Sequence, residues 1–121
     1  ALSLEAVFGF LFAPLAWAMG VEAADVLPVG TLLGEKVAVN EFVAYASLRD
    51  LKASLSERSV LISTYALCGF ANFASIAIQI GGIGGIAPSR KGEVAALGLR
   101  AVLGGALASW TTATIAGVLV G

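Results

Sequence analysis

The stretch that decides the fold is an apolar run interrupted by an amide and a carboxylate, Val37-Ala38-Val39-Asn40-Glu41-Phe42-Val43-Ala44-Tyr45. A second polar island follows in another apolar segment, Phe70-Ala71-Asn72-Phe73-Ala74-Ser75. An isolated carboxylate at the centre of a bilayer costs about 2.5–3.5 kcal/mol on insertion scales. We therefore expect Glu41 to face a cavity, a partner or a substrate, with the second island as another wall of that cavity.

The composition around these islands is that of a membrane protein. Of 121 residues, 59% are hydrophobic and only 12% are charged, whereas soluble domains have about 25% charged residues. A soluble domain of this length exposes too much of its surface to hide so many apolar side chains. The composition predicts an all-α integral membrane protein. The net charge of -1 and the absence of a basic run argue against a nucleic-acid partner.

The chemistry available to the chain is narrow. It has no histidine, which removes histidine-based acid–base catalysis and histidine metal sites. Cys68 is the only cysteine, so neither an intrachain disulfide nor a cysteine-pair metal site can form. We predict that the chain is not an enzyme, with no catalytic residues, no cofactor and no metal ligands. The same features disfavour a membrane enzyme that acts on lipid.

The first half of the chain divides into a span and a broken segment. Residues 1–22 are predicted as a transmembrane helix, because Ala6 to Val21 carry no charge, and Pro14 is expected to kink it. Residues 23–48 are interrupted too often to span. They are predicted as a re-entrant helical hairpin with its tip near Gly34-Glu35-Lys36. Because non-helical backbone at membrane depth needs protein or water around it, the tip suggests a binding cavity.

The second half is predicted as a broken helix and a final helix. Residues 56–88 form the broken transmembrane helix, because an unbroken helix over the uncharged run would be about 46 Å long, against a core of about 30 Å. The break is expected between Gly69 and Ser75, and Ser54-Leu55-Ser56-Glu57 is predicted as a capping box. Residues 92–121 are the final transmembrane helix. Since the chain begins at Ala1, we interpret it as part of a longer protein.

Glu41 is the first candidate for ligand binding. A carboxylate can accept hydrogen bonds from two neighbouring hydroxyls, or its charge can be coupled to a cation. The alternative is an ion pair with Lys36, although a five-residue spacing is poor for one helix face, and Lys36 could equally extend to the membrane surface. Asn40 is expected to cap a helix end.

Asn72 and Ser75 are the next candidates, since an i, i+3 pair shares one helix face. An amide and a hydroxyl together suit a ligand with several hydroxyls, and the alternative is hydrogen bonding between helices. Phe70 could pack on a base, and Gln79 could line the path. The threonines are expected to bond their own backbone.

These motifs resemble a known family. Gly34-x-Lys36-x-x-x-Asn40-Glu41-Phe42-Val43-Ala44-Tyr45 is similar to a signature of the concentrative nucleoside transporters, and so is the stretch Ala66-Leu67-Cys68-Gly69-Phe70-Ala71-Asn72-Phe73-Ala74-Ser75-Ile76. The resemblance implies the C-terminal portion of such a transporter: a scaffold helix, a re-entrant hairpin, a broken helix and a last helix. It also implies a homotrimer in which each protomer holds its own site.

The resemblance implies roles for single residues. Glu41, Asn72 and Ser75 fall on positions that contact ribose in the family, and Phe70 falls on a position that packs at the nucleoside. The sequence departs from many members at Ala74, where they have a serine. The residues that read the base and the main sodium site are expected outside this chain.

The function implied is symport of nucleosides across the cytoplasmic membrane, coupled to Na⁺ or H⁺, in a multi-pass protein of the inner or plasma membrane. The expected partners are a uridine-like nucleoside, the lipid bilayer, the remaining half of the transporter and further copies of it. Two alternatives stay open: a structural membrane subunit, whose polar residues bind only neighbouring helices, and a transporter of nucleobases or another polar metabolite.

Overall fold

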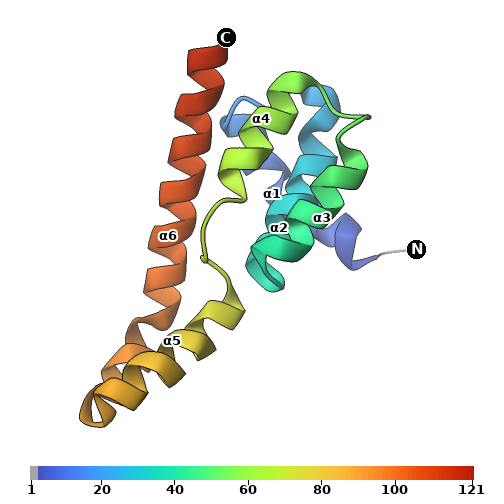
Figure 1. Ribbon diagram of the computed structural model, residues 1–121. Helices are drawn as coiled ribbons and strands as arrows, with labels where there is room; N and C mark the ends of the chain where they lie inside the picture. Colours follow the sequence, from blue (N-terminus) through green and yellow to red (C-terminus); the bar gives the residue numbers. More distant parts are fainter. Residues whose placement is uncertain (1–2) are drawn as a thin grey trace.

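The computed structural model describes residues 3–121, and its regular elements are helices (Figure 1). This confirms the prediction of an all-α fold. The six α-helices are α1 (Leu4–Ala18), α2 (Val26–Ala38), α3 (Glu41–Leu51), α4 (Glu57–Ala66), α5 (Phe73–Ile86) and α6 (Lys91–Val120), and two 3₁₀ turns are η1 (Ala23–Asp25) and η2 (Pro88–Arg90).

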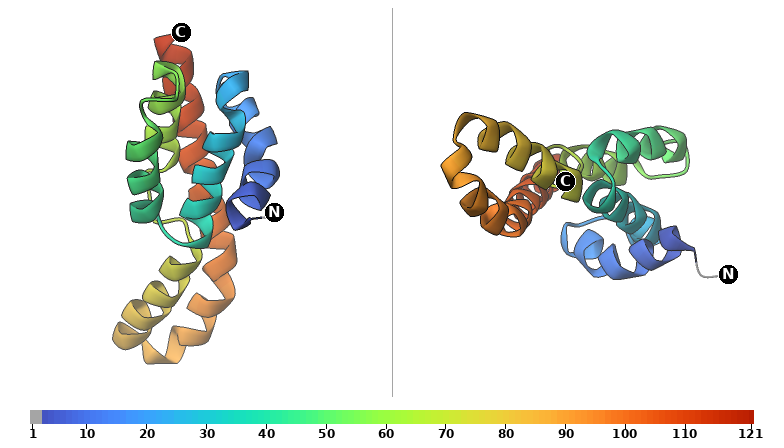
Figure 2. Two further views of the ribbon diagram at one scale, coloured as in Figure 1. Left: turned by 90° about the vertical axis from the view of Figure 1, so that its right-hand side faces the viewer. Right: turned by 90° about the horizontal axis from the view of Figure 1, so that it is seen from below.

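Helices α1 to α4 form one bundle, and α6 runs beside it from end to end (Figure 1). Helix α5 packs on the first part of α6, so that these two helices project beyond the bundle (Figure 2). The buried apolar core lies within the bundle and against α6, and its members include Val29, Leu32, Leu33, Ile62, Leu67 and Ala113. Helix α4 is therefore held between the bundle and α6.

Helix α1 packs closely against α2. A Cβ atom added to Gly30 would lie 2.6 Å from the Gly9 carbonyl oxygen, so the contact needs a glycine. Helix α1 has only 15 residues, about 22 Å at 1.5 Å per residue, and by itself does not reach across the hydrocarbon core. It is shorter than the transmembrane helix predicted over 1–22, because the chain turns at Gly20 with a φ of 91°. Residues 1 and 2 of that prediction lie outside the described residues.

The turn between α2 and α3 lies at Val39 and Asn40, later than predicted. The prediction of a tip near Gly34-Glu35-Lys36 was wrong, because α2 continues through these residues to Ala38. Gly34 is buried against Phe8 of α1, so its missing side chain serves packing between the helices. The helix pair α2–α3 therefore presents Asn40 and Glu41 at its turn.

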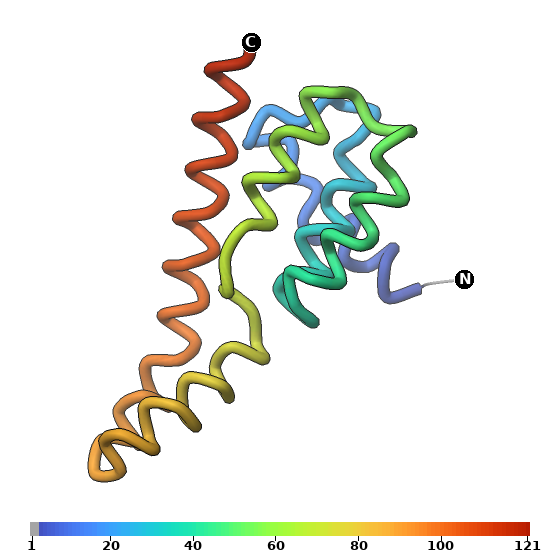
Figure 3. Tube along the Cα trace, in the orientation of Figure 1, coloured from blue at the N-terminus to red at the C-terminus, as the bar shows by residue number. Residues whose placement is uncertain are grey.

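Helices α4 and α5 are separated by residues 67–72, which we call the break (Figure 3). Helix α4 does not start with the predicted capping box at Ser54, whose hydroxyl donates to the Leu51 carbonyl (2.8 Å). Instead Ser56 is the N-cap, and its hydroxyl accepts from the Ser59 amide (3.1 Å). Ser56 directly precedes the first residue of α4, so its hydroxyl can accept from an amide of the first turn that has no partner within the helix.

One helix in the described part of the chain is long and apolar enough to cross a membrane. It is formed by η2 and α6 together, over 33 residues from Pro88 to Val120, and contains an 18-residue window with a mean hydropathy of 1.5. Large apolar side chains on it are exposed, among them Leu99, Leu103 and Leu119. A surface of this kind suits contact with lipid or with another hydrophobic segment.

A polar clamp fixes the end of α4 that lies away from the break. Arg58 Nε donates to the Gly20 carbonyl (2.9 Å), and Arg58 Nη1 donates to the Gly117 carbonyl on α6 (2.7 Å). Asp25 Oδ2 accepts from the Ser56 amide (3.0 Å) at the start of the same helix. The first turn of α4 is thus tied to the turn after α1, to η1 and to α6.

Candidate functional site

The two polar islands meet in the structure. Asn72 Nδ2 donates a hydrogen bond to Glu41 Oε2 at 2.9 Å. Glu41 is the first residue of α3 and Asn72 is the N-cap of α5, so the contact joins the α2–α3 turn to the end of the break. The side chain of Asn72 is buried, with 2% of the residue exposed. Candidates that are 31 residues apart in sequence therefore form one cluster.

Two helix N-termini converge on this cluster. Asn40 Oδ1 accepts from the Val43 amide (2.9 Å) at the start of α3, which confirms its expected capping role. Asn72 Oδ1 accepts from the Ser75 amide (2.8 Å) at the start of α5. A helix N-terminus carries about half a positive charge. The carboxylate of Glu41 is thus placed where the backbone favours negative charge, both in its own helix and in α5.

Ser75 completes the cluster. Its hydroxyl lies 2.9 Å from Asn72 Oδ1 and also contacts the Phe70 carbonyl oxygen. A hydroxyl has one proton to donate, so it serves one of these acceptors at a time and keeps its own lone pairs for a ligand donor. The cluster of Glu41, Asn72 and Ser75 combines a carboxylate, an amide and a hydroxyl. Together these groups can accept from and donate to a ligand that carries neighbouring hydroxyls.

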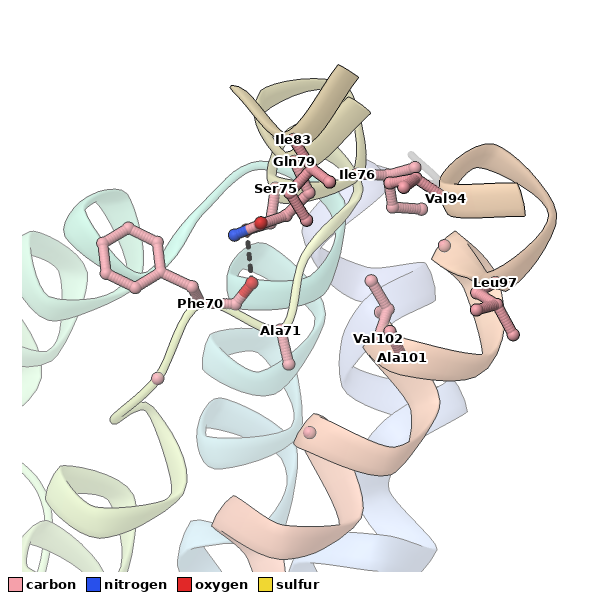
Figure 4. Close-up of a pocket in the computed structure, with 13 residues that line it drawn as sticks. Phe70, Ala71, Ser75, Ile76, Gln79, Ile83, Val94, Leu97, Ala101 and Val102 are labelled. Atoms are coloured by element: carbon pink, nitrogen blue, oxygen red, sulfur yellow. Dashed lines mark hydrogen bonds between the residues drawn. The ribbon is translucent and has the colours of Figure 1, made fainter. Parts of the chain in front are cut away.

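Phe70 lies in the break and is 72% exposed. Figure 4 shows its ring pointing away from the other residues that line a cavity of about 470 Å³ between the break, α5 and α6. This cavity is mostly apolar, with Ser75 and Gln79 among its lining residues, whereas Glu41 and Asn72 do not line it. The Phe70 ring can therefore pack on a group from outside this chain, and Gln79 shares the cavity with Ser75 but not with Glu41 or Asn72.

Lys36 is placed differently from both sequence interpretations. Its residue is fully buried, so it does not extend to the surface. It makes no ion pair with Glu41; the salt bridges within residues 3–121 join Arg49 to Asp50 and Arg90 to Glu93. Instead, Lys36 Nζ donates to the Ala66 carbonyl (3.0 Å) at the end of α4. Sequence spacing could not identify this partner, because it lies 30 residues away.

The threonine hydroxyls bond their own helices, as expected. Thr64 donates to the Val60 carbonyl (2.7 Å), Thr112 to the Ala108 carbonyl (2.9 Å), and Thr114 to the Trp110 carbonyl (2.8 Å). In the part of the chain that the structure describes, no group of three or more His, Cys, Asp or Glu residues could hold a metal ion.

Comparison with known proteins identifies the family. The model of the Na⁺ dependent nucleoside transporter C-terminus matches residues 1–117. The chain belongs to this family. It is therefore part of a family of membrane transporters and not an enzyme.

The relatives agree with this assignment. The chain is 46% identical to a putative nucleoside permease, NupX, of Escherichia coli, over 98% of the chain and 29% of the relative. Its fold matches the structure of CNTnw in an inward-facing substrate-bound state with a TM-score of 0.93 and 44% identity, covering 96% of this chain and 29% of that one. A variant of CNTnw in an outward-facing state matches with a TM-score of 0.92 and 43% identity, over the same shares. The chain spans between 19% and 30% of the length of the curated relatives it matches.

Proposed function

We propose that the protein to which this chain belongs is a secondary active transporter that carries nucleosides across the cytoplasmic membrane, coupled to Na⁺ or H⁺. In this proposal Glu41, Asn72 and Ser75 bind the ribose. The observation that carries it is the hydrogen bond between Asn72 Nδ2 and Glu41 Oε2 at 2.9 Å. It unites two polar groups that would otherwise be costly in an apolar chain.

A ribose matches the hydrogen-bonding capacity of the cluster. Two neighbouring hydroxyls can donate to the Glu41 carboxylate, while the Asn72 amide and the Ser75 hydroxyl bond the same sugar. When the ligand binds, each polar group replaces a hydrogen-bond partner within the protein by one on the ligand. No polar group is then left without a hydrogen bond in a medium of low dielectric. The exposed ring of Phe70 offers an apolar face on which the nucleoside packs.

The proposed transport step moves α2–α3 and the break together. Sites between broken helices at the middle of the membrane are common in secondary transporters, and alternating access is largely rigid-body motion. The fold of this chain matches an inward-facing and an outward-facing structure of CNTnw equally well, with TM-scores of 0.93 and 0.92. The elements of this chain thus keep a similar arrangement in both states, which supports a motion in which α2–α3 and the break move together.

The rest of the transporter is expected to supply what this chain lacks. The chain covers between 19% and 30% of the length of its relatives, and large apolar residues such as Phe10, Leu11 and Leu107 are exposed. We propose that the remaining half of the transporter and the lipid bilayer cover these surfaces, that α2–α3 is re-entrant, and that the complete protein is a homotrimer.

The test is cation-dependent uptake of labelled uridine by the complete transporter, with Glu41→Gln compared at matched membrane expression. The control is Glu57→Gln, which makes the same substitution at the first residue of α4, where the side chain is exposed. We expect saturable uptake that Glu41→Gln reduces at least roughly 100-fold, since it removes a charge-assisted bond to each hydroxyl. Glu57→Gln should leave uptake unchanged. Uptake in Na⁺ and in a proton gradient identifies the coupling ion.

Other outcomes point to the alternatives. If the wild type does not take up uridine but does take up a labelled free nucleobase, the cargo is a nucleobase. A loss of expression in Glu41→Gln, with normal uridine affinity in the surviving protein, would indicate that the cluster only joins helices.

A further inference from the structure

The C-terminal end of α4 and the first residues of the break accept hydrogen bonds from side chains of three other helices. The last carbonyls of a helix have no partner within it, and at membrane depth water does not supply one. Tyr45 Oη donates to the Thr64 carbonyl (2.7 Å), Lys36 Nζ to the Ala66 carbonyl (3.0 Å), and Ser109 Oγ to the Cys68 carbonyl (2.7 Å). These donors come from α3, α2 and α6, so the end of α4 is fixed from three directions.

Backbone bonds satisfy the carbonyls in between. The Leu67 amide donates to Ser63 (2.9 Å), and the Cys68 amide donates to Tyr65 (3.2 Å). The carbonyls of residues 63 to 66 are therefore all occupied, alternately by the backbone and by a side chain. The place where α4 stops depends on these side chains as well as on the sequence of α4 itself.

Lys36 differs from the other two donors in burial and charge. Its residue is 0% exposed, whereas Tyr45 and Ser109 are partly exposed. A positive charge at a helix C-terminus is favoured by the helix dipole, and a bond from a charged donor is stronger than one between neutral groups. Of the three donors, we therefore expect removal of the Lys36 ammonium to change the conformation at the end of α4 most.

The Lys36 bond joins the same two segments as the contact in the site. Lys36 lies five residues before Glu41, and its acceptor Ala66 lies six residues before Asn72. The bonds Lys36–Ala66 and Glu41–Asn72 therefore form two successive cross-links between α2–α3 and the broken helix. Because the Lys36–Ala66 bond fixes the start of the break, it limits the positions that Asn72, at the other end of the break, can take.

We infer that Lys36 is a positioning residue: through the Ala66 carbonyl it fixes the end of α4 and so holds Asn72 opposite Glu41. The effect of Lys36 on transport rests on the proposed function. The effect of Lys36 on the conformation of the break rests on the two hydrogen bonds alone. Lys36 does not touch the ligand in this account. It acts through the backbone of residues 67–72.

Cys68 provides a reporter of the break that needs no substrate. It is the only cysteine of the chain, it is exposed, and it lies between Ala66 and Asn72. In the complete transporter, with any cysteine outside these 121 residues replaced by serine, the rate at which a maleimide alkylates Cys68 reports on the conformation of the break.

The experiment compares Lys36→Met with Tyr45→Phe. Both remove one donor from the end of α4, but Tyr45 bonds the Thr64 carbonyl, further from Asn72. We expect Lys36→Met to raise the KM for uridine roughly 10- to 100-fold, as small displacements of binding groups do, and to change the Cys68 alkylation rate at least threefold, about 0.65 kcal/mol at 25 °C. Tyr45→Phe should lower the melting temperature and leave both quantities within about twofold.

The outcomes separate the two proposals. If the wild type does not transport uridine, the proposed function fails, and the Cys68 rate still tests Lys36. A folded Lys36→Met with normal KM and a normal Cys68 rate would overturn the inference. Should that variant not reach the membrane, Lys36→Gln takes its place: its amide is one bond shorter and uncharged, so a KM raised at least threefold is expected, and an unchanged KM and Cys68 rate would equally overturn it.

Discussion

Asparagine begins two helices in this protein, and the two residues differ in what else they bond. Asn40 Oδ1 caps α3 and Asn72 Oδ1 caps α5, with nearly equal distances of 2.9 and 2.8 Å to the backbone amides. Asn72 also donates from Nδ2 to Glu41. An amide suits this double task, because its oxygen accepts while its nitrogen donates. The second bond is what distinguishes a helix cap from a residue of the candidate site.

Replacing each asparagine by serine separates capping from binding. Serine is as good an N-cap as asparagine, so Asn40→Ser should change the free energy of unfolding by less than about 1 kcal/mol. Asn72→Ser also loses the bond to Glu41, and we expect it to cost about 1–3 kcal/mol. Only Asn72→Ser removes the amide donor that faces Glu41. We expect it to raise the uridine KM of the complete transporter at least tenfold, the equivalent of about 1.4 kcal/mol, with Asn40→Ser near wild type. Equal KM values in kinetic assays would contradict a ligand role for Asn72.

At the scale of elements, the break between α4 and α5 is where local sequence and tertiary contacts act together. Gly69 adopts a φ of 111°, and a Cβ atom there would lie 3.1 Å from Ser109 Oγ. The Ser109 hydroxyl in turn bonds the Cys68 carbonyl. The break is therefore a defined turn held against α6, and its geometry sets the direction in which α5 starts.

Gly69→Ala should strain this turn. A non-glycine residue at positive φ costs about 1–2 kcal/mol, and the Ser109 bond would also be disturbed. We expect a lower melting temperature for the purified complete transporter, together with weaker uridine binding because Asn72 follows the turn. Gly92→Ala is the control: it lies in a helix with open space around its Cβ position, where alanine is favoured by up to about 1 kcal/mol. A melting temperature unchanged by Gly69→Ala would count against a fixed turn.

At the scale of the whole molecule, a polar clamp lies at one end of α4 and the candidate site lies beyond the other. The Arg58 guanidinium joins the end of α1 to the end of α6, and Asp25 holds the first turn of α4. The break and the turn between α2 and α3 lie at the opposite end of α4 (Figure 1), and the Glu41–Asn72 contact joins them. Stability and ligand binding should therefore respond to different substitutions.

Arg58→Met tests this separation. It removes two hydrogen bonds from a charged donor, and we expect a loss of about 2–4 kcal/mol of unfolding free energy, seen as a lower melting temperature. Uridine KM in the surviving folded transporter should stay within about twofold of wild type. The control Arg49→Met breaks an ion pair whose side chains are 80% and 71% exposed, which contributes at most about 1 kcal/mol. If Arg58→Met changed the uridine KM without lowering the melting temperature, the Arg58 end of α4 and the candidate site would be coupled, which would contradict this prediction.

The sequence by itself determined the helical class, the family and the residues of the candidate cluster. Apolar composition, interrupted runs and two motifs are local properties, and they need no knowledge of which segments touch. The tertiary structure decided where α2 turns, where α4 begins, and what Lys36 bonds. Gly34 looked like a turn residue because its packing partner, Phe8, is 26 positions away, and Lys36 looked like a surface lysine because its acceptor is a backbone carbonyl 30 positions away. Partners of this kind are set by chain topology, which spacing along one segment does not encode.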